Sequence, residues 1–423
     1  MTYFLIFYDN VRICGFIIYL TATLFCFNYG SDNSNKEANM ELKIRFFQDT
    51  NQSFFLFGPR GTGKSTWIKQ HLGNALLIDL LAPEVYRFYS AKPERLREVS
   101  EAQESVGTIV IDEVQKVPQL LDVVHQLMEK NERWRFVLTG SSARKLKRSG
   151  VDLLAGRALI KAMHPFMAAE LGDRFSLKEA LTIGMIPLVL YAVSPKEAIG
   201  AYVSIYLREE VQIEGLVRNI GAFSRFLESV SFSHGAVLNI SDVARDCQIE
   251  RKTVEGYVSI LEDLLLAFRI PIFTKRAKRN LSSHPKFYYF DAGVFRSVRP
   301  AGPLDAPQEI DGAALEGLVA QHLRAWISYR GDICKLYFWR TKSRNEVDFI
   351  MYGQDTFCAI EVKNTTKIHT KMLNGLLAFK KDYHEAQICC LYRGKERIKI
   401  KGVLCLPVEE FLIGLRPQNP IQF

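Results

Sequence analysis

Short, uninterrupted runs of aliphatic and aromatic residues recur in the first third of the chain, and each is followed by polar residues. Residues 53–57, 108–111 and 135–138 are such runs. Uninterrupted apolar runs of this length are typical of strands in a parallel sheet, which is buried on both faces. Residues 66–72 follow the first run and read as a helix. The pattern predicts an α/β domain built on a parallel sheet.

The middle of the chain changes to a helical period. Between residues 172 and 233, apolar residues recur at spacings near 3.6 and no cluster of catalytic residue types is present, so a helical connector or lid is expected. Residues 242–246 and 251–267 then read as two helices joined by a turn, with Ser241 as the expected cap of the first helix. The positions expected to form the core of this helix-turn-helix are Ala244, Ile249, Val254 and Tyr257.

The last third predicts a mixed α/β fold. Residues 339–365 read as two strands joined by a turn that contains Gly353, and an apolar helical segment precedes them.

Size and composition narrow the class of protein. The chain has 423 residues, which is enough for two or three domains, and its 48% hydrophobic and 24% charged content excludes disordered and collagen-like classes. A net charge of +9 favours a polyanionic partner such as nucleic acid. The eight cysteines contain no C-x-x-C pair, so neither a zinc site nor a disulfide framework is expected. A reducing, cytoplasmic setting fits this cysteine usage.

The first 39 residues form a separate, apolar extension. Residues 13–29 carry no charge, but their length is at the lower limit for a helix that spans a bilayer. The preferred interpretation is that Met40 is the true start and that the preceding segment is a mis-assigned start. A membrane anchor is the alternative, and membrane association is not expected.

A phosphate-binding motif follows the first apolar run. The text GPRGTGKST fits G-x-x-x-x-G-K-[ST], in which glycines let backbone N–H groups point at phosphate oxygens. Lys64 would bind the β- and γ-phosphates of ATP, and the Ser65 hydroxyl would bind Mg²⁺. The residues expected to contact the nucleotide are Gly58, Pro59, Arg60, Gly61, Thr62, Gly63, Lys64, Ser65 and Thr66.

A second acidic motif supports the first. The segment TIVIDEVQKVP is a β-branched strand that ends in Asp112 and Glu113 and looks like a Walker B element. Asp112 would hold Mg²⁺ through water, and Glu113 would orient or deprotonate the attacking water. The alternative is a strand that merely ends in two solvated acids.

Several motifs in order resemble one family. FLFGPRGTGKST, LLIDLLAPEVYRFYSAKP, IVIDEVQKVPQLLDVVH, VLTGSS and LLAGR are together similar to the bacterial and archaeal AAA-type ATPases that carry a C-terminal DUF4143 region, from about residue 40 to near the end of the chain. The resemblance implies an ATP-binding AAA+ domain, a winged-helix region and a nuclease-like C-terminal domain. The expected divisions are 1–39, 40–170, 171–235, 236–300 and 301–423, in the order extension, ATPase, helical connector, winged helix and nuclease-like domain.

The same resemblance implies two further roles at the ATPase site. Thr139 or Ser141, at the end of the third strand, stands where such ATPases sense the γ-phosphate; ordinary capping of the strand end is the alternative. Arg157 stands where they often carry an arginine finger, and a structural ion pair is the alternative.

A basic segment beside the helix pair suits contact with DNA. Arg251, Lys252 and Thr253 would begin the recognition helix. Six Lys or Arg and no acid lie between Arg269 and Lys286, as expected for a basic wing. The run 144–148, with four basic residues, could add to this footprint. The alternatives are a module that only packs or docks proteins, and solvated loops.

The predicted strand pair near the C-terminus carries a second group of chemically active residues. Asp348 lies on the first strand, while Glu361 and Lys363 share one face of the second. Two carboxylates that hold Mg²⁺ and a lysine that activates water are the pattern of a PD-(D/E)XK nuclease, and Glu316 matches an acidic position of its first helix. Cross-strand ion pairs, or a scaffold that binds DNA without cleavage, are the alternatives.

The sequence therefore predicts an ATPase that uses Mg·ATP to drive or gate an interaction with DNA. An ATP-regulated nuclease is one alternative, and a slow nucleotide-state switch that binds a protein or DNA partner is another. Homo-oligomers are common among AAA+ proteins, although nothing in these residues demands one.

Overall fold

The computed structural model describes residues 45–103, 106–130, 133–141, 154–206, 219–274, 284–331, 333–342, 345–421 and 423. Contacts divide the chain into Met1–Lys43 and Ile44–Phe423, and every described residue belongs to the second unit. The expectations for the extension before Met40 and for the basic run 144–148 therefore lie outside the described residues. Among the residues that are described, no helix is long and apolar enough to cross a membrane.

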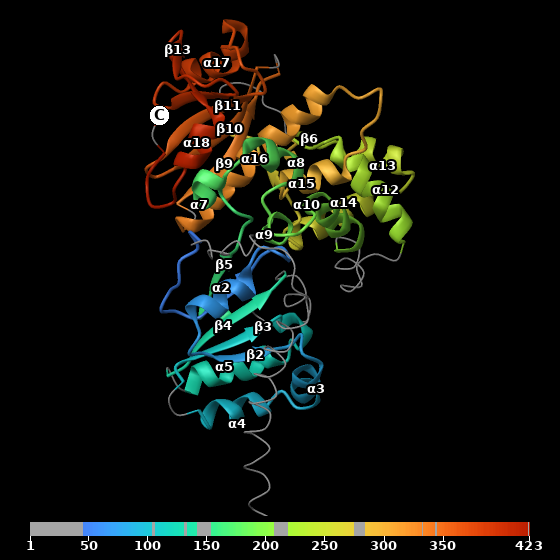
Figure 1. Cartoon of the computed structure of the whole chain (residues 1–423), viewed down its shortest axis with the longest axis vertical. Helices are drawn as coiled ribbons and strands as arrows, with labels where there is room; N and C mark the ends of the chain where they lie inside the picture. Colours follow the sequence, from blue (N-terminus) through green and yellow to red (C-terminus); the bar gives the residue numbers. More distant parts are fainter. Residues whose placement is uncertain are drawn as a thin grey trace, which may run out of the picture. The chain divides into compact units, whose positions relative to one another are not determined.

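A five-stranded parallel sheet begins the described unit, as the apolar runs predict (Figure 1). Its order is β2-β3-β4-β1-β5, and every neighbouring pair is parallel. The carboxyl ends of all five strands therefore lie along one edge. The strands are β1 (Phe54–Phe57), β2 (Leu76–Asp79), β3 (Thr108–Asp112), β4 (Arg135–Gly140) and β5 (Leu159–Ala162).

Both faces of this sheet are buried, which explains the uninterrupted apolar runs. Successive side chains of a strand point to opposite faces. Phe54 of β1 accordingly packs in one cluster with Trp67, whereas Phe55 packs in a second cluster with Leu127. Trp67 lies on α2 (Lys64–His71) and Leu127 on α5 (Leu120–Lys130). Two further helices, α3 (Pro83–Ala91) and α4 (Arg95–Glu101), lie between β2 and β3 in the sequence.

Short helices follow the parallel sheet, as the 3.6-residue period predicts for this part of the chain. The described ones are α7 (Ala168–Leu171), η3 (Gly172–Arg174), α8 (Leu177–Ile183), α9 (Pro187–Leu190), α10 (Pro195–Ala201), η4 (Tyr202–Tyr206) and α12 (Ile220–Ser231).

The predicted helix pair is present, with different ends. α13 (Ile240–Cys247) and α14 (Arg251–Asp263) are its two helices. Asn239, not Ser241, caps α13, because the Asn239 side chain accepts hydrogen bonds from the backbone N–H groups of Ser241 and Asp242. The second helix ends at Asp263 rather than at residue 267, since Leu265 adopts a positive φ of 59° and turns the chain into a strand.

A three-stranded antiparallel sheet accompanies this helix pair, in the order β6-β8-β7. Its strands are β6 (Ala236–Val237), β7 (Ala267–Ile270) and β8 (Lys286–Tyr289). The expected hairpin is therefore formed by β7 and β8. Assignment of the whole region as a winged helix remains a prediction.

The C-terminal part is a six-stranded mixed sheet beside one long helix, as expected for a mixed α/β region (Figure 1). The helix α16 (Pro307–Tyr329) follows α15 (Ala292–Val298). In the order β13-β14-β12-β11-β10-β9, the two inner ladders formed by β12 with β11 and with β14 are parallel and the other three are antiparallel. The strands and remaining helices are β9 (Cys334–Arg340), β10 (Glu346–Gly353), β11 (Phe357–Lys363), η5 (Thr370–Leu373), α17 (Asn374–Asp382), β12 (Gln387–Tyr392), β13 (Ile398–Ile400), β14 (Val403–Pro407) and α18 (Val408–Gly414).

One hydrophobic core runs from the short helices through the helix pair to the mixed sheet. Phe226 of α12, Leu261 of α14, Trp326 of α16 and Ile360 of β11 all belong to it. These regions therefore support one another by packing.

Gly293 of α15 makes a close backbone contact in this core, which a substitution can test. An alanine Cβ at Gly293 of α15 would lie 2.3 Å from the backbone oxygen of Ile183 at the end of α8. We expect Gly293→Ala to lower the free energy of unfolding by about 1–3 kcal/mol, because backbone must move. In urea unfolding, the control Gly256→Ala in α14, which meets no atom within 4 Å, should instead stabilise by about 0.5–1 kcal/mol. Equal effects of the two substitutions would contradict this packing.

Candidate functional site

The loop between β1 and α2 has the backbone that its glycines predict. Gly61 and Gly63 have φ values of 78° and 94°, a region that other residues rarely adopt. An alanine Cβ at Gly58 would lie 2.5 Å from the Met163 carbonyl oxygen. The loop therefore curls tightly at the carboxyl edge of the sheet and leads into the amino end of α2, where free N–H groups favour an anion.

Lys64 is held inside this loop. Its side chain is buried, and Nζ donates to the carbonyl oxygens of Gly58 at 2.6 Å and of Pro59 at 3.3 Å. Thr62 Oγ1 donates to the same Pro59 oxygen at 2.8 Å. A lysine ammonium is thus placed within the curl of the loop, where a phosphate oxygen could replace a carbonyl oxygen as its partner.

The Asp112 carboxylate, at the end of β3, joins this strand to α2 and to β4. Ser65 Oγ, in the first turn of α2, donates to Asp112 Oδ2 at 2.9 Å. Thr139 Oγ1, near the end of β4, donates to the other carboxylate oxygen. Asp112 is only 5% exposed. The structure thus brings together Ser65 and Asp112, the two predicted ligands of the ATPase magnesium.

Glu113 occupies a strained backbone position beside Asp112. Its φ of 60° and ψ of 47° lie in the left-handed region, which is uncommon for a residue with a side chain. Its N–H donates to Thr139 Oγ1 at 3.0 Å, and its carboxylate accepts a hydrogen bond from Gln115 Nε2. The Thr139 hydroxyl therefore positions both acids.

Gln115 is a site residue that the motif analysis missed. Its Nε2 also donates to Ser141 Oγ at 3.3 Å, so Ser141 reaches Glu113 only through Gln115. Gly140 leaves the space for this amide, since a Cβ there would lie 2.6 Å from Gln115 Oε1. The available signal in the sequence was a glutamine three residues after the aspartate that ends the strand.

Arg157 lies at the other edge of the sheet from the phosphate loop. It precedes β5, which runs parallel to β1, so it lies near the amino ends of these strands. Its guanidinium contacts His125 and pairs with Glu129 at 3.1 Å, both on α5. This is the structural ion pair that the sequence left open. A finger role in the site of its own chain is not supported by this placement, and a role in a neighbouring chain stays a prediction.

A buried arginine supports the back of the phosphate loop. Arg45 NH1 donates to the Thr62 carbonyl oxygen at 2.7 Å, and Arg45 Nε pairs with Glu170 at 3.0 Å. Glu170 also accepts from the N–H groups of Phe46 and Met167. Burial by itself would lower the pKa of Arg45, but Glu170 and Tyr329, through their charges and hydrogen bonds, together outweigh it, so the pKa is raised overall. No motif marks Arg45, because its role depends on contacts far along the chain.

Other regions hold the outer side of the same loop. The Leu188 N–H of α9 donates to the Gly61 carbonyl oxygen at 3.2 Å, and Tyr202 Oη donates to that of Arg60 at 3.1 Å. Tyr329, at the end of α16, accepts from Arg45 at 3.3 Å. A change in the conformation of the phosphate loop would therefore alter its contacts with helices outside the parallel-sheet domain.

The donor set at this edge fits Mg²⁺ and a triphosphate. Hydroxyl and carboxylate oxygens of Ser65 and Asp112 are hard ligands of the kind that Mg²⁺ prefers. The ammonium of Lys64 and the amino end of α2 supply positive charge for phosphates. The two sets lie next to each other because α2 begins with Lys64 and Ser65.

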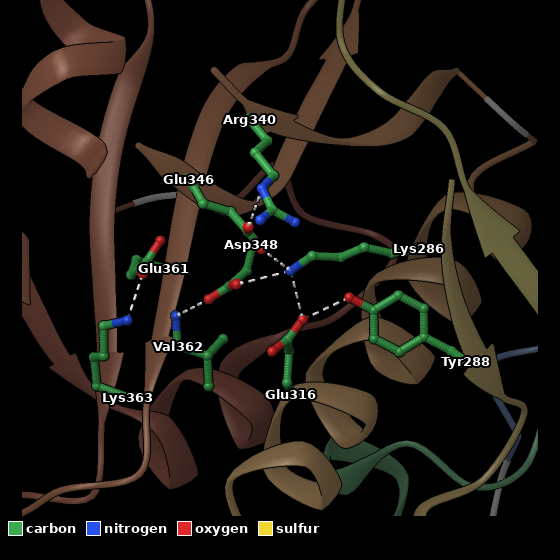
Figure 2. A network of polar contacts seen from close by, with 9 residues as sticks. All are labelled: Lys286, Tyr288, Glu316, Arg340, Glu346, Asp348, Glu361, Val362 and Lys363. Atoms are coloured by element: carbon green, nitrogen blue, oxygen red, sulfur yellow. Dashed lines mark hydrogen bonds and ion pairs between the residues drawn. The ribbon is translucent and has the colours of Figure 1, made fainter. Parts of the chain in front are cut away.

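The C-terminal carboxylates gather around a lysine from a different region (Figure 2). Lys286 Nζ, on β8, lies 3.0 Å from Glu316 Oε1, 2.6 Å from Glu346 Oε1 and 3.1 Å from Asp348 Oδ1. Burial alone would lower the pKa of Lys286, and the surrounding acids, Glu316 foremost, raise it well above its ordinary value. We call these four residues the Lys286 cluster.

This position corrects one expectation. Lys286 was assigned to an exposed basic wing, yet it is 1% exposed and paired with acids. Arg269, at the other end of that segment, pairs with Glu262 through two hydrogen bonds. The basic residues at 275, 276, 278 and 279 lie outside the described residues.

Tyr288 reinforces the Lys286 cluster from the same strand. Residues two apart on a strand share a face, and Tyr288 Oη donates to Glu316 Oε1 at 2.6 Å. Burial, and after it the charge of Asp348, raises the pKa of Glu316 to about 7. Glu316 is therefore placed near the other carboxylates, as predicted, but against Lys286.

The Asp348 side chain also links β10 to β11 beyond the end of their hydrogen-bonded ladder. The β10–β11 ladder ends at the pair Phe349 and Ile360, and beyond it Asp348 Oδ2 accepts the Val362 N–H at 2.9 Å. The register of β10 against β9 shifts between Val347 and Ile350, so Asp348 lies in a bulge. Both oxygens of Asp348 are thus occupied by protein donors.

Glu361 and Lys363 form a separate pair, as Figure 2 shows. Lys363 Nζ lies 2.5 Å from Glu361 Oε1, whereas Glu361 Oε2 is buried without a partner among the described residues. Burial, with the charge of Asp348 second, raises the pKa of Glu361 to about 8. The described residues contain no group of three or more His, Cys, Asp or Glu that could hold a metal ion. Glu316 and Asp348 are paired with Lys286, and Glu361 is paired with Lys363, so the nuclease metal site predicted from these residues stays a prediction.

The start of α14 leaves basic side chains in solvent, as predicted for a recognition helix. Arg251 and Lys252 are exposed, and Thr253 is half-buried. Arg251 pairs with Glu255 one turn along the helix, at 3.1 Å. Such an exposed pair is weak and can open for another anion.

Family models match three consecutive parts of the chain. One described as an AAA domain matches residues 50–172, and two described as domains of unknown function match residues 174–305 (DUF8612) and 311–411 (DUF4143). The AAA domain and the DUF4143 region are those that the motifs predict. An AAA domain indicates a nucleotide-dependent activity.

Similar proteins are known from several bacteria, and their names give no function. The uncharacterized proteins Rv2008c of Mycobacterium tuberculosis and Mb2031c of Mycobacterium bovis are each 24% identical over 376 residues, 84% of this chain and 80% of theirs. An uncharacterized protein of Haemophilus influenzae is 23% identical over 399 residues, 87% of this chain and 96% of its own. The crystal structure of protein VC1899 from Vibrio cholerae, 12% identical, covers 77% of this chain and 90% of its own with a TM-score of 0.19, too low to bear on the fold.

The raised pKa of Glu361 predicts a pH-dependent stability. A carboxyl group whose pKa is near 8 when folded and near 4.5 when unfolded stabilises fully below pH 4.5, and this contribution is lost as pH rises through 8. Glu361→Gln should remove that loss, so the thermal midpoints of variant and wild type should agree near pH 5 and diverge at pH 9 in favour of the variant. The exposed control Glu396→Gln should leave the wild-type pH profile unchanged. If the thermal midpoints of wild type and Glu361→Gln changed with pH in parallel, the burial of Glu361 would not contribute to the pH dependence of stability.

Proposed function

We propose that this chain binds Mg·ATP at residues 58–66 and hydrolyses it, and that the nucleotide cycle drives or gates an interaction with DNA. The observation that carries the first part is the contact of Ser65 and Thr139 with the two oxygens of Asp112, next to the buried ammonium of Lys64. These contacts support the proposal that the groups for phosphate, metal and water lie together at one edge of the sheet.

Each residue has a definite task in this reaction. The N–H groups of the loop would bind phosphate oxygens, and Lys64 would exchange its carbonyl partners for the β- and γ-phosphates. Mg²⁺ supplies charge neutralisation on the phosphates when it is bound, with Ser65 and Asp112 as its protein ligands. Glu113 would accept the proton of, or orient, the attacking water. Thr139 holds Glu113 and Asp112 in register, which supports a positioning role for this residue.

Lys64 and Glu113 should separate binding from turnover. Lys64→Ala should weaken ATP binding by about 10- to 100-fold, since it removes charged hydrogen bonds. Glu113→Gln should retain ATP binding and lower the rate of phosphate release by about 10²- to 10⁴-fold. Titration with a fluorescent ATP analogue and a phosphate-release assay measure the two effects. Lys69→Ala, at an exposed position of the same helix, is the matched control and should change neither.

If Lys64→Ala left both ATP affinity and turnover unchanged, the nucleotide would not bind in this loop. Tight ATP binding with phosphate release near background would favour the slow nucleotide-state switch instead. The contacts of Leu188 and Tyr202 with the loop carbonyls support that second reading, because they would transmit the state of the loop to other helices.

DNA is the partner that the charge distribution supports. The net charge is +9, and Arg251 and Lys252 are exposed at the start of α14. DNA should raise the ATPase rate of the full chain at low salt and lose this effect as salt rises, because phosphate contacts release counterions. Arg251→Ala with Lys252→Ala should reduce the stimulation without altering the basal rate. If DNA left the ATPase rate unchanged at every salt concentration, ATP hydrolysis would not be coupled to DNA binding.

Nuclease activity is not favoured by this arrangement. The predicted metal-binding carboxylates Glu316 and Asp348 are engaged by Lys286, and Glu361 is engaged by Lys363. Incubation of the protein with linear and circular DNA, Mg²⁺ and ATP tests the alternative directly. If the wild-type protein cleaved DNA and Asp348→Ala abolished the cleavage, the nuclease alternative would be supported.

A further inference from the structure

The Lys286 ammonium has a carboxylate partner for each of its N–H donors. An ammonium has three N–H donors, and Lys286 Nζ has three carboxylate partners, on Glu316, Glu346 and Asp348. The partners come from two elements, α16 and β10, while the lysine comes from β8 (Figure 2). Lys286 also lies over the Phe338 ring, at 5.7 Å from its centroid.

The acids of the Lys286 cluster have little capacity left for a metal ion. Asp348 Oδ2 accepts the Val362 N–H, and Glu346 Oε2 pairs with Arg340 at 3.4 Å. The Glu316 oxygen that faces Lys286 also accepts from Tyr288. Divalent cations need several free oxygen ligands at 2–2.6 Å, and a cation at the position of the ammonium would collide with it.

We propose that Lys286 is a built-in counter-cation that excludes divalent metal from the carboxylates of the DUF4143 region. The cluster then fastens the β7–β8 hairpin to α16 and β10 and does not cut a phosphodiester. The inference concerns residues that the proposed ATPase does not use, so it stands or falls separately from ATP hydrolysis.

The local structure explains why a lysine is required at this position. Lys286 and Tyr288 share the face of β8 that meets Glu316. Gly235, with a φ of 73°, lies against the same carboxyl group, since a Cβ there would be 3.4 Å from it. Three carboxylates this close, without a cation, would repel one another at low dielectric. A metal ion and a lysine are alternative ways to remove this repulsion.

The direct test is the binding of Mn²⁺ to the full chain without nucleotide. In an isothermal titration, wild type should show no site that depends on Asp348, so Asp348→Asn should leave its titration unchanged. Lys286→Met should gain one Mn²⁺ site, bound about tenfold or more tighter than any site of wild type, because the competing charge is gone. Adding Asp348→Asn to Lys286→Met should abolish that site.

Lys363→Met is the matched control. It removes a neighbouring ammonium and leaves Lys286 in place, so it should gain no Mn²⁺ site. An Mn²⁺ site in wild type that Asp348→Asn removes would overturn the proposal, and this titration decides the matter even if Lys286→Met does not fold. A folded Lys286→Met, shown by circular dichroism, that gains no site would also overturn it.

Discussion

The contact of Asp112 with Ser65 and Thr139 is the interaction on which the nucleotide-binding part of the structure depends. It is possible only because β3 and β4 are parallel neighbours and α2 begins at the same edge of the sheet. The carboxylate is buried, so it needs donors on both oxygens. A hydroxyl on either side satisfies it and sets the distance between the loop and the Glu113 backbone.

Two buried cations contact the long helix α16. Arg45 pairs with Glu170 behind the loop, and Lys286 pairs with acids beside the mixed sheet. Both cations contact α16, through Tyr329 at its end and Glu316 near its middle. Removing one partner of a buried ion pair is costly, about 3–5 kcal/mol, so such contacts fix the elements that carry them. The same helix therefore participates in both polar networks.

Local patterns predicted the parallel sheet, the glycine loop, the helix pair and the strands β10 and β11, because periodicity and turn residues act over a few positions. Asn239 and Leu265 changed helix ends through a side-chain cap and a positive φ, which the period of the apolar residues does not encode. Lys286 was the largest error. Its basic neighbours favoured a solvent-exposed wing, whereas its real partners lie 30 to 62 residues further along the chain. Arg45 was missed for the same physical reason, because its partners Thr62 and Glu170 lie 17 and 125 residues further along the chain.

Amide hydrogen exchange of the full chain, with and without Mg·ATP, tests the central claim most directly. If phosphates bind in the loop and Ser65 and Asp112 hold the metal, the backbone N–H groups of residues 58–66 should become protected, together with those next to Asp112. Protection confined to other segments, with the exchange of the loop unchanged, would contradict this account.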